Sequence, residues 1–159
     1  MIKQLCVSDL EHCLLVIRES HASVAKEFNL TRENCPKHTS FIEMRNLQYH
    51  MENGYLMYGY FIKNSIAGYC SLENKDNGVF ELHNLAVLPK YRHKGLGTQM
   101  LDFCKAKVRE MGGSKITLGL IEENITLKKW YCANGFTHVG TKKFEHLPFT
   151  VGYMENGLQ

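Results

Sequence analysis

The chain has 159 residues, a net charge of +3 at pH 7, and 44% hydrophobic and 22% charged residues. This length and composition predict one globular domain over residues 1–159 with a core of its own. Basic residues alternate with acidic ones, which argues against a nucleic-acid partner, and no apolar run is long enough to cross a membrane. The six cysteines show no CxxC spacing, and the first nine residues lack a signal-peptide pattern. We therefore expect free thiols, no metal site and a cytoplasmic protein.

The first third of the chain predicts one strand and two helices. In chain order these are an edge strand at 2–7, a helix from residue 8, an irregular loop at 27–39 and a helix from residue 39 or 40 to about 51. Ser8 is the expected N-cap of the first helix, and Glu11 would complete a capping box. Thr39 or Ser40 is the expected cap of the second.

The rest of the chain predicts a meander followed by a crossover. The predicted elements are strands at 55–63, 66–73 and 79–88, a helix at 95–111, a strand at 115–121, a helix at 125–133, and strands at 136–143 and 149–154. Strand, helix and strand between 79 and 121 require a right-handed crossover and one parallel pair. The sequence predicts a mixed α/β (α+β) fold whose central, mostly antiparallel sheet is flanked by helices.

The strand predicted at 79–88 does not alternate strictly. Leu82 and Leu85 both need burial although they are three residues apart, which predicts a β-bulge near His83 and Asn84. A bulge kinks the strand and releases backbone groups from the ladder. A strand buried on both faces would also lack alternation, so that alternative stays open.

A basic turn, Arg92-His93-Lys94-Gly95-Leu96-Gly97, joins this strand to the next helix. Its glycines let the backbone approach a ligand, and the helix N-terminus favours an anion such as a pyrophosphate. The alternative is a turn that only starts the helix, but two glycines in a first turn cost helix stability. Met100 excludes the dinucleotide fingerprint, and Thr98 stands where a P-loop needs lysine.

A second segment, Asn124 to Phe136, also carries a pattern. Asn124 can cap a helix and Gly135 can end it. Tyr131 is not needed for a core that its apolar neighbours already fill, so it is a candidate functional residue.

The two segments together resemble the GNAT superfamily of acetyl-CoA-dependent N-acetyltransferases. Arg92, Gly95 and Gly97 match its acyl-CoA-binding motif, (Arg or Gln)-x-x-Gly-x-(Gly or Ala). Residues 124–136 match its second segment, Asn-x-x-Ala-x-x-x-Tyr-x-x-x-Gly-Phe, with Leu127 in place of the small residue. The resemblance extends over about residues 79–136. The N-terminal third of the chain matches the family only in the order of its strands and helices.

The resemblance implies a GNAT-like acyl-CoA N-acyltransferase fold and direct transfer of an acetyl group from acetyl-CoA to a primary amine in a ternary complex, without a metal. It also implies that acetyl-CoA contacts Leu85, Ala86, Val87, Arg92, His93, Lys94, Gly95, Leu96, Gly97, Thr98, Asn124 and Tyr131.

The resemblance also gives chemical roles to three residues, Val87, Tyr131 and Glu81. The Val87 N–H would stabilise the oxyanion, and Tyr131 would protonate the CoA thiolate. Glu81 would accept the proton of the amine directly or through water, with His83 in reserve. A strand glutamate is commonly solvated or salt-bridged instead, and which of the two is the base stays open.

The amine acceptor, a small molecule or a peptide, is not identified by the sequence. Candidate acceptor contacts lie in the loops at 27–40 and 145–149 and beside them: Arg32, Glu33, His38, Tyr49, His146 and Phe149. The sequence contains no acidic cluster of the kind that would indicate a polyamine or aminoglycoside acceptor. A non-catalytic acyl-CoA-binding module and an acyltransferase with a longer acyl-CoA are the alternatives, and Glu81 with Tyr131 favours an enzyme. The resembled family also commonly forms homodimers.

Overall fold

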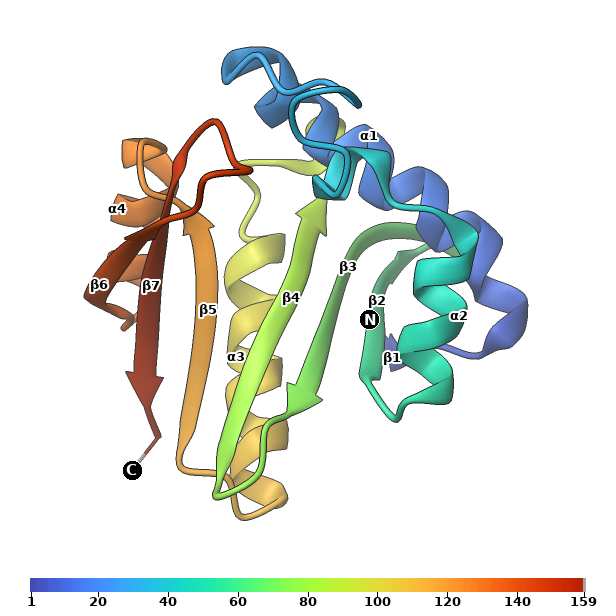
Figure 1. Ribbon diagram of the computed structural model, residues 1–159. Helices are drawn as coiled ribbons and strands as arrows, with labels where there is room; N and C mark the ends of the chain where they lie inside the picture. Colours follow the sequence, from blue (N-terminus) through green and yellow to red (C-terminus); the bar gives the residue numbers. More distant parts are fainter. Residues whose placement is uncertain (159) are drawn as a thin grey trace.

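The computed structural model describes residues 1–158. Its elements are β1 (Ile2–Gln4), α1 (Leu10–Glu27), α2 (Met44–Glu52), β2 (Leu56–Ile62), β3 (Ser65–Asn74), β4 (Val79–Val87), α3 (Leu96–Glu110), β5 (Lys115–Ile121), α4 (Ile125–Ala133), β6 (Thr137–Lys143) and β7 (Thr150–Gly157). The strands form one sheet in the order β1-β2-β3-β4-β5-β7-β6 (Figure 1). Neighbouring strands are antiparallel except for the parallel β4–β5 pair, which confirms the predicted mixed α/β class.

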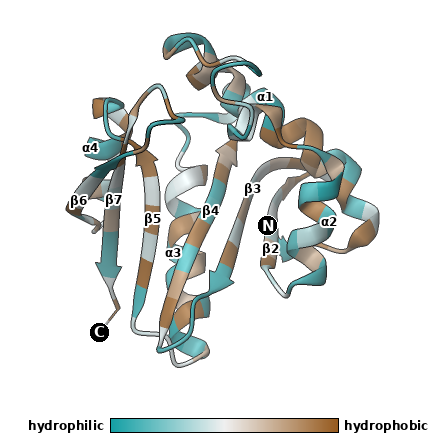
Figure 2. Cartoon of the chain, in the orientation of Figure 1, coloured by the Kyte–Doolittle hydropathy of each residue, from teal (hydrophilic) through white to brown (hydrophobic). Residues whose placement is uncertain are grey.

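Helices cover both faces of this sheet. On one face α3 packs with its apolar stripe, which includes the fully buried Met100, Cys104 and Val108 at four-residue spacing. On the other face α1 buries Cys13 and Ile17 against β2 and β3. Full burial of one large apolar side chain contributes about 1.5–3 kcal/mol. In Figure 2 the hydrophobic residues lie mainly in the central strands and in α1, as this packing requires.

The predicted bulge is present in β4. Tyr69 of β3 pairs with Ala86, and Ser71 pairs with His83, so two steps along β3 match three steps along β4. Asn84, inside the bulge, has a positive φ of 55°, a conformation that asparagine tolerates better than most residues. The extra residue kinks β4 at this point.

The parallel strands β4 and β5 are paired only at the start of β4 and separate after Glu81. Only Val79–Glu81 pair with β5, at Lys115–Thr117, and the rest of β5 pairs with β7 alone. The two strands diverge toward their C-terminal ends (Figure 1). This leaves a gap in the sheet beside the bulge.

The N-terminal segment departs from the prediction in two places. β1 ends at Gln4 rather than Val7. The capping box lies two residues earlier than predicted, because the Cys6 N–H donates to the Asp9 carboxylate at 2.9 Å. A 3₁₀ turn at Val7–Asp9 therefore precedes the helix, and α1 begins at Leu10 rather than after Ser8.

The second helix also starts later than predicted. Thr39–Phe41 form a separate 3₁₀ turn, and Ile42 is extended, with a ψ of 142°, which interrupts the helix. Glu43 is the N-cap of α2, and its N–H donates to the Asn46 side chain at 2.9 Å. The C-terminal strand is longer than predicted, since β7 pairs with β5 as far as Gly157. Among the described helices, none is long and apolar enough to cross a membrane.

Candidate active site

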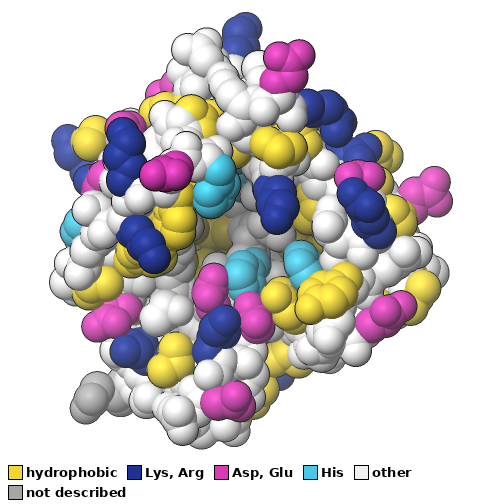
Figure 3. Space-filling view, viewed as in Figure 1, with side chains coloured by type: hydrophobic (Ala, Val, Ile, Leu, Met, Phe, Trp, Pro, Cys, Tyr) yellow, Lys and Arg dark blue, Asp and Glu magenta, His cyan; other side chains and the backbone are white. Residues whose placement is uncertain are grey.

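The gap between β4 and β5 opens into a cleft of about 920 Å³. Its walls come from α1, the loop before α2, β4, the turn that follows it, β5, α4 and β7. Figure 3 shows the hollow at the centre of one face, with histidine and acidic side chains gathered around it. Of the predicted acetyl-CoA contacts, the cleft brings together all except Lys94, whose ammonium instead lies 5.9 Å from the centre of the Tyr91 ring.

The turn after β4 presents a row of free backbone donors. Within residues 1–158, no protein acceptor takes the N–H groups of His93 through Thr98, and Gln99 is the next residue whose N–H is bonded, to the Gly95 carbonyl at 3.0 Å. Gly95 caps α3 with a φ of +84°, which glycine adopts without strain. Six unpaired amides and the positive end of the α3 dipole make an anion-binding site.

Gly97 is required by packing against α4. A Cβ at this position would lie 2.9 Å from the Trp130 ring. The absence of a side chain therefore lets the first turn of α3 contact α4, which closes one end of the cleft.

Arg92 connects the end of β4 to α1. Its guanidinium donates to the Val87 carbonyl at 3.2 Å, to the Ser23 hydroxyl at 3.3 Å and to the Ser20 carbonyl. Its partners are thus neutral oxygens of the protein. Arg92 lines the cleft, where its charge adds to the positive potential of the turn.

The Val87 N–H faces the gap. The next residue, Leu88, donates its N–H to the Ala67 carbonyl beside β3, at 2.9 Å. Because successive residues of a strand point their N–H groups to opposite sides, the Val87 N–H points away from β3 and toward β5. It is a hydrogen-bond donor in the open part of the sheet.

Asn124 and Tyr131 lie on the opposite wall. The Asn124 side chain caps α4 by accepting the Leu127 N–H at 3.2 Å. Tyr131 is 7% exposed and lies edge-on to Trp130 and Phe136. Burial raises the pKa of Tyr131 above its ordinary value, so its hydroxyl keeps its proton at physiological pH and can act as a donor.

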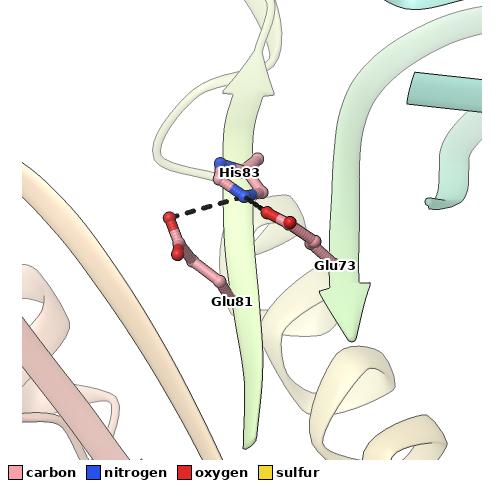
Figure 4. A group of neighbouring side chains, drawn as sticks. All are labelled: Glu73, Glu81 and His83. Carbon is pink, nitrogen blue, oxygen red and sulfur yellow. Dashed lines mark hydrogen bonds and ion pairs between the residues drawn. The ribbon is translucent and has the colours of Figure 1, made fainter. Parts of the chain in front are cut away.

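A carboxylate–imidazole–carboxylate cluster lies on the α1 side of the sheet. The His83 Nε2 atom is 2.8 Å from Glu73 Oε1 and 3.4 Å from Glu81 Oε2 (Figure 4). Burial acts to raise the pKa of Glu73, but hydrogen bonds from His83 and Tyr55 outweigh it and lower that pKa below its ordinary value. This acidic cluster was not predicted, because only the β3–β4 register places Glu73 opposite Glu81 and a linear sequence pattern does not show that register.

His21 is a second residue of the site that was not predicted. This residue of α1 lines the cleft, and its buried Nε2 atom has no hydrogen-bond partner within residues 1–158. Burial, with the charges of His38 and Arg92, lowers the pKa of His21 to about 4. Helical spacing could have identified His21 as a buried residue, since it lies on the same face of the helix as Leu14 and Ile17, the face that packs on the sheet.

The predicted acceptor contacts are only partly brought together. His38 and Phe149 line the cleft. Arg32 and Glu33 line a separate depression of about 530 Å³, formed with Leu30, Thr31 and Phe41. Tyr49, which is 59% exposed, and His146 line neither.

The shifted pKa of His21 predicts a pH-dependent stability. Between pH 6.5 and about 4 the unfolded chain binds a proton at this ring and the folded chain does not, so the free energy of unfolding falls as the pH falls. In His21→Gln this loss should be smaller by on the order of 2 kcal/mol between pH 7 and 4, measured by urea unfolding. His12→Gln, an exposed histidine of the same helix, should follow the wild type. Equal pH dependence of His21→Gln and wild type would contradict this assignment.

Comparison with known proteins agrees with this geometry. A family model described as the acetyltransferase (GNAT) family matches residues 22–136. An uncharacterized N-acetyltransferase in the pepI 3′ region of Lactobacillus delbrueckii subsp. lactis is 32% identical over 95 residues, or 54% of each chain. The chain thus spans about half the length of the curated relatives it matches.

Solved structures share the fold over the whole chain. The ribosomal-protein-S18-alanine N-acetyltransferase from Escherichia coli has a TM-score of 0.81 at 16% identity and covers 100% of this chain and 94% of its own. The PaiA N-acetyltransferase from Thermoplasma acidophilum, solved with coenzyme A, has a TM-score of 0.74 at 24% identity over 99% of this chain and 98% of its own. Since the family model spans well over half of the residues, the chain belongs to the acetyltransferase (GNAT) family.

Proposed function

We propose that the protein transfers an acetyl group from acetyl-CoA to a primary amine by direct attack in a ternary complex. The observation that carries this proposal is the row of six unpaired amides at His93–Thr98, which continues into the open gap between β4 and β5. A ligand that has a pyrophosphate at one end and an extended amide-bearing arm at the other matches both features. Membership of the acetyltransferase (GNAT) family supports acetyl-CoA as that ligand.

The donor would be held mainly by backbone. The amides of residues 93–98 would bind the pyrophosphate, and the free edge of β4 at Leu85–Val87 would pair with the pantetheine arm. Asn124 has its Oδ1 engaged in the helix cap, so its amide nitrogen is the group left for the arm. Trp130 and Leu127 would pack against it from the other wall.

The reaction needs one proton removed and one supplied. An ammonium group must lose a proton before it can attack, and Glu81 and His83 both line the cleft where that proton could go. As the nitrogen bonds to the thioester carbon, the Val87 N–H would stabilise the charge on the oxygen. When the carbon–sulfur bond breaks, Tyr131 would donate its proton to the thiolate.

The remaining predictions concern the domain organisation, the need for a metal, the cellular compartment and the oligomeric state. We take residues 1–159 as a single catalytic domain acting without a metal on a small-molecule or peptide amine. The free state of all six cysteines supports a reducing compartment, and hence the cytoplasm. The homodimer remains a prediction from the family resemblance.

Acetyl-CoA should raise the melting temperature far more than NAD or ATP, because only acetyl-CoA fills both the turn and the gap. A ligand at 100 times its Kd stabilises the fold by about 2.7 kcal/mol. Gly95→Ala should lose most of this shift. Gly54→Ala is the matched control, since the two glycines have a similar positive φ, +84° at Gly95 and +79° at Gly54, and a Cβ at either would meet no atom closer than 3.9 Å. No shift with acetyl-CoA, or an equal shift in both variants, would contradict the proposed site.

Tyr131→Phe should lower kcat by roughly 100-fold while the acetyl-CoA-dependent thermal shift is retained, because the phenyl ring keeps the packing but cannot protonate the thiolate. The measurement is thiol release from acetyl-CoA across a panel of amines. Tyr58→Phe, a buried tyrosine of the same core cluster outside the cleft, should keep wild-type turnover. Wild-type turnover by Tyr131→Phe on a good acceptor would refute the assigned acid.

A further inference from the structure

Glu73 stands behind the cleft rather than in it. Glu81 and His83 line the cleft, whereas Glu73 reaches His83 from the neighbouring strand β3. The contact from Glu73 Oε1 to His83 Nε2, at 2.8 Å, is the shorter of the two carboxylate contacts in Figure 4. Glu73 therefore acts on the cleft through the imidazole ring.

The ring is also held in its plane. Tyr55 stacks on His83 at 5.5 Å between ring centres and 24° between planes, and His50 stacks on Tyr55 at 4.4 Å and 3°. A hydrogen bond at one edge and a stacked ring on one face leave the imidazole little rotational freedom.

This arrangement selects one tautomer. An ionised carboxylate only accepts hydrogen bonds, so the His83 Nε2 atom beside Glu73 must carry the proton. In the neutral ring the lone pair then resides on Nδ1. A carboxylate that orients an imidazole in this way prepares it to accept a proton at its other nitrogen.

We propose that His83 removes the proton from the acceptor ammonium, and that Glu73 is a positioning residue that holds His83 in the required tautomer. In this step the N–H bond of the ammonium breaks, its electron pair stays on the amine nitrogen, and an N–H bond forms at His83 Nδ1. The imidazolium so formed lies between two carboxylates. The inference rests on the proposed acetyl transfer and assigns the base that it leaves open.

Two arguments favour His83 over Glu81 as the base. Glu73, at 2.8 Å from Nε2, and the stacked Tyr55 ring hold His83 in place, whereas Glu81 joins the cluster only through the longer contact to Nε2, at 3.4 Å. In addition, the two carboxylates outnumber the single cation of Lys75, 3.7 Å from Glu73, so the cluster with a neutral imidazole carries a net negative charge. The cluster therefore attracts an ammonium group and stabilises the imidazolium, and Glu81 supplies part of that charge.

The pH dependence involves every charged or titratable group around the ring. These are Glu73 and, behind it, Lys75 at 3.7 Å from β3; Glu81 from β4; Tyr55 from the start of β2; and His50 from α2. Burial first, then Glu73, raises the pKa of Tyr55 to about 12, so the phenol stays neutral. Glu73 is the group whose removal changes the charge next to Nε2.

The test compares the pH profile of kcat/KM for Glu73→Gln, Glu73→Asp and wild type. Loss of the carboxylate makes the imidazole a weaker base, so in Glu73→Gln the acid limb should move to lower pH and the plateau should fall about 10- to 100-fold. Glu73→Asp, which keeps a carboxylate, should show a smaller shift of the acid limb and a smaller fall of the plateau than Glu73→Gln. Glu155→Gln is the control, because Glu155 pairs with Lys115 at 3.3 Å in the same sheet but outside the cleft. A wild-type profile in Glu73→Gln would overturn the inference.

A second readout does not depend on turnover. Nitrogen-15 shifts of the His83 ring should show the Nε2–H tautomer in wild type and a mixture of tautomers in Glu73→Gln, whose amide can donate or accept. An Nδ1–H tautomer in wild type would overturn the inference while leaving acetyl transfer intact. If acetyl-CoA does not raise the melting temperature of the wild type, by contrast, the proposed function itself is overturned.

Discussion

The early separation of β4 from β5 is the constraint on which the rest of the structure depends. A parallel pair normally continues along its full length, but here it ends at Glu81. The bulge at Asn84 turns β4 away, whereas β7 pairs with the opposite edge of β5 along its whole length. The backbone groups of Leu85–Val87 that a sheet neighbour would have bonded are thus left facing a cleft.

The cleft has opposite electrostatic character at its two ends. At the end of β4 the unpaired amides, the α3 dipole and Arg92 present positive potential. Lower on β4, the His83 imidazole lies between Glu81 of the same strand and Glu73 of the neighbouring β3. A donor with phosphates and an acceptor with an ammonium group would therefore enter a common cleft from electrostatically different sides, and their reacting groups would meet near the bulge.

Features built from local sequence could be predicted. The glycine turn, the α4 cap at Asn124 and the bulge each follow from residues close together in the chain, and the structure confirms the turn, the cap and the bulge. The features that were missed depend on tertiary placement. Glu73 joins the site only through the β3–β4 register, and His21 only through the packing of α1 on β4.

The two corrections in the N-terminal segment have different causes. The first capping box formed at Cys6 rather than Ser8 because the Asp9 carboxylate captures the Cys6 N–H. The second helix starts after Glu43 because the backbone is extended at Ile42, and the side chain of Thr39, a predicted cap, contacts Asn84 of the bulge at 3.2 Å between their side-chain oxygens. That contact ties the loop before α2 to the cleft, so the departure from a simple helix start has a place in the site.

Hydrogen exchange of the backbone amides tests the central claim most directly. The N–H groups of His93–Thr98 have no acceptor in the protein, so they should exchange rapidly in the free chain and become protected in saturating acetyl-CoA. The amides of α2, remote from the turn, should be unaffected. Binding of acetyl-CoA with unchanged exchange at residues 93–98 would contradict the assignment of this turn as the pyrophosphate site.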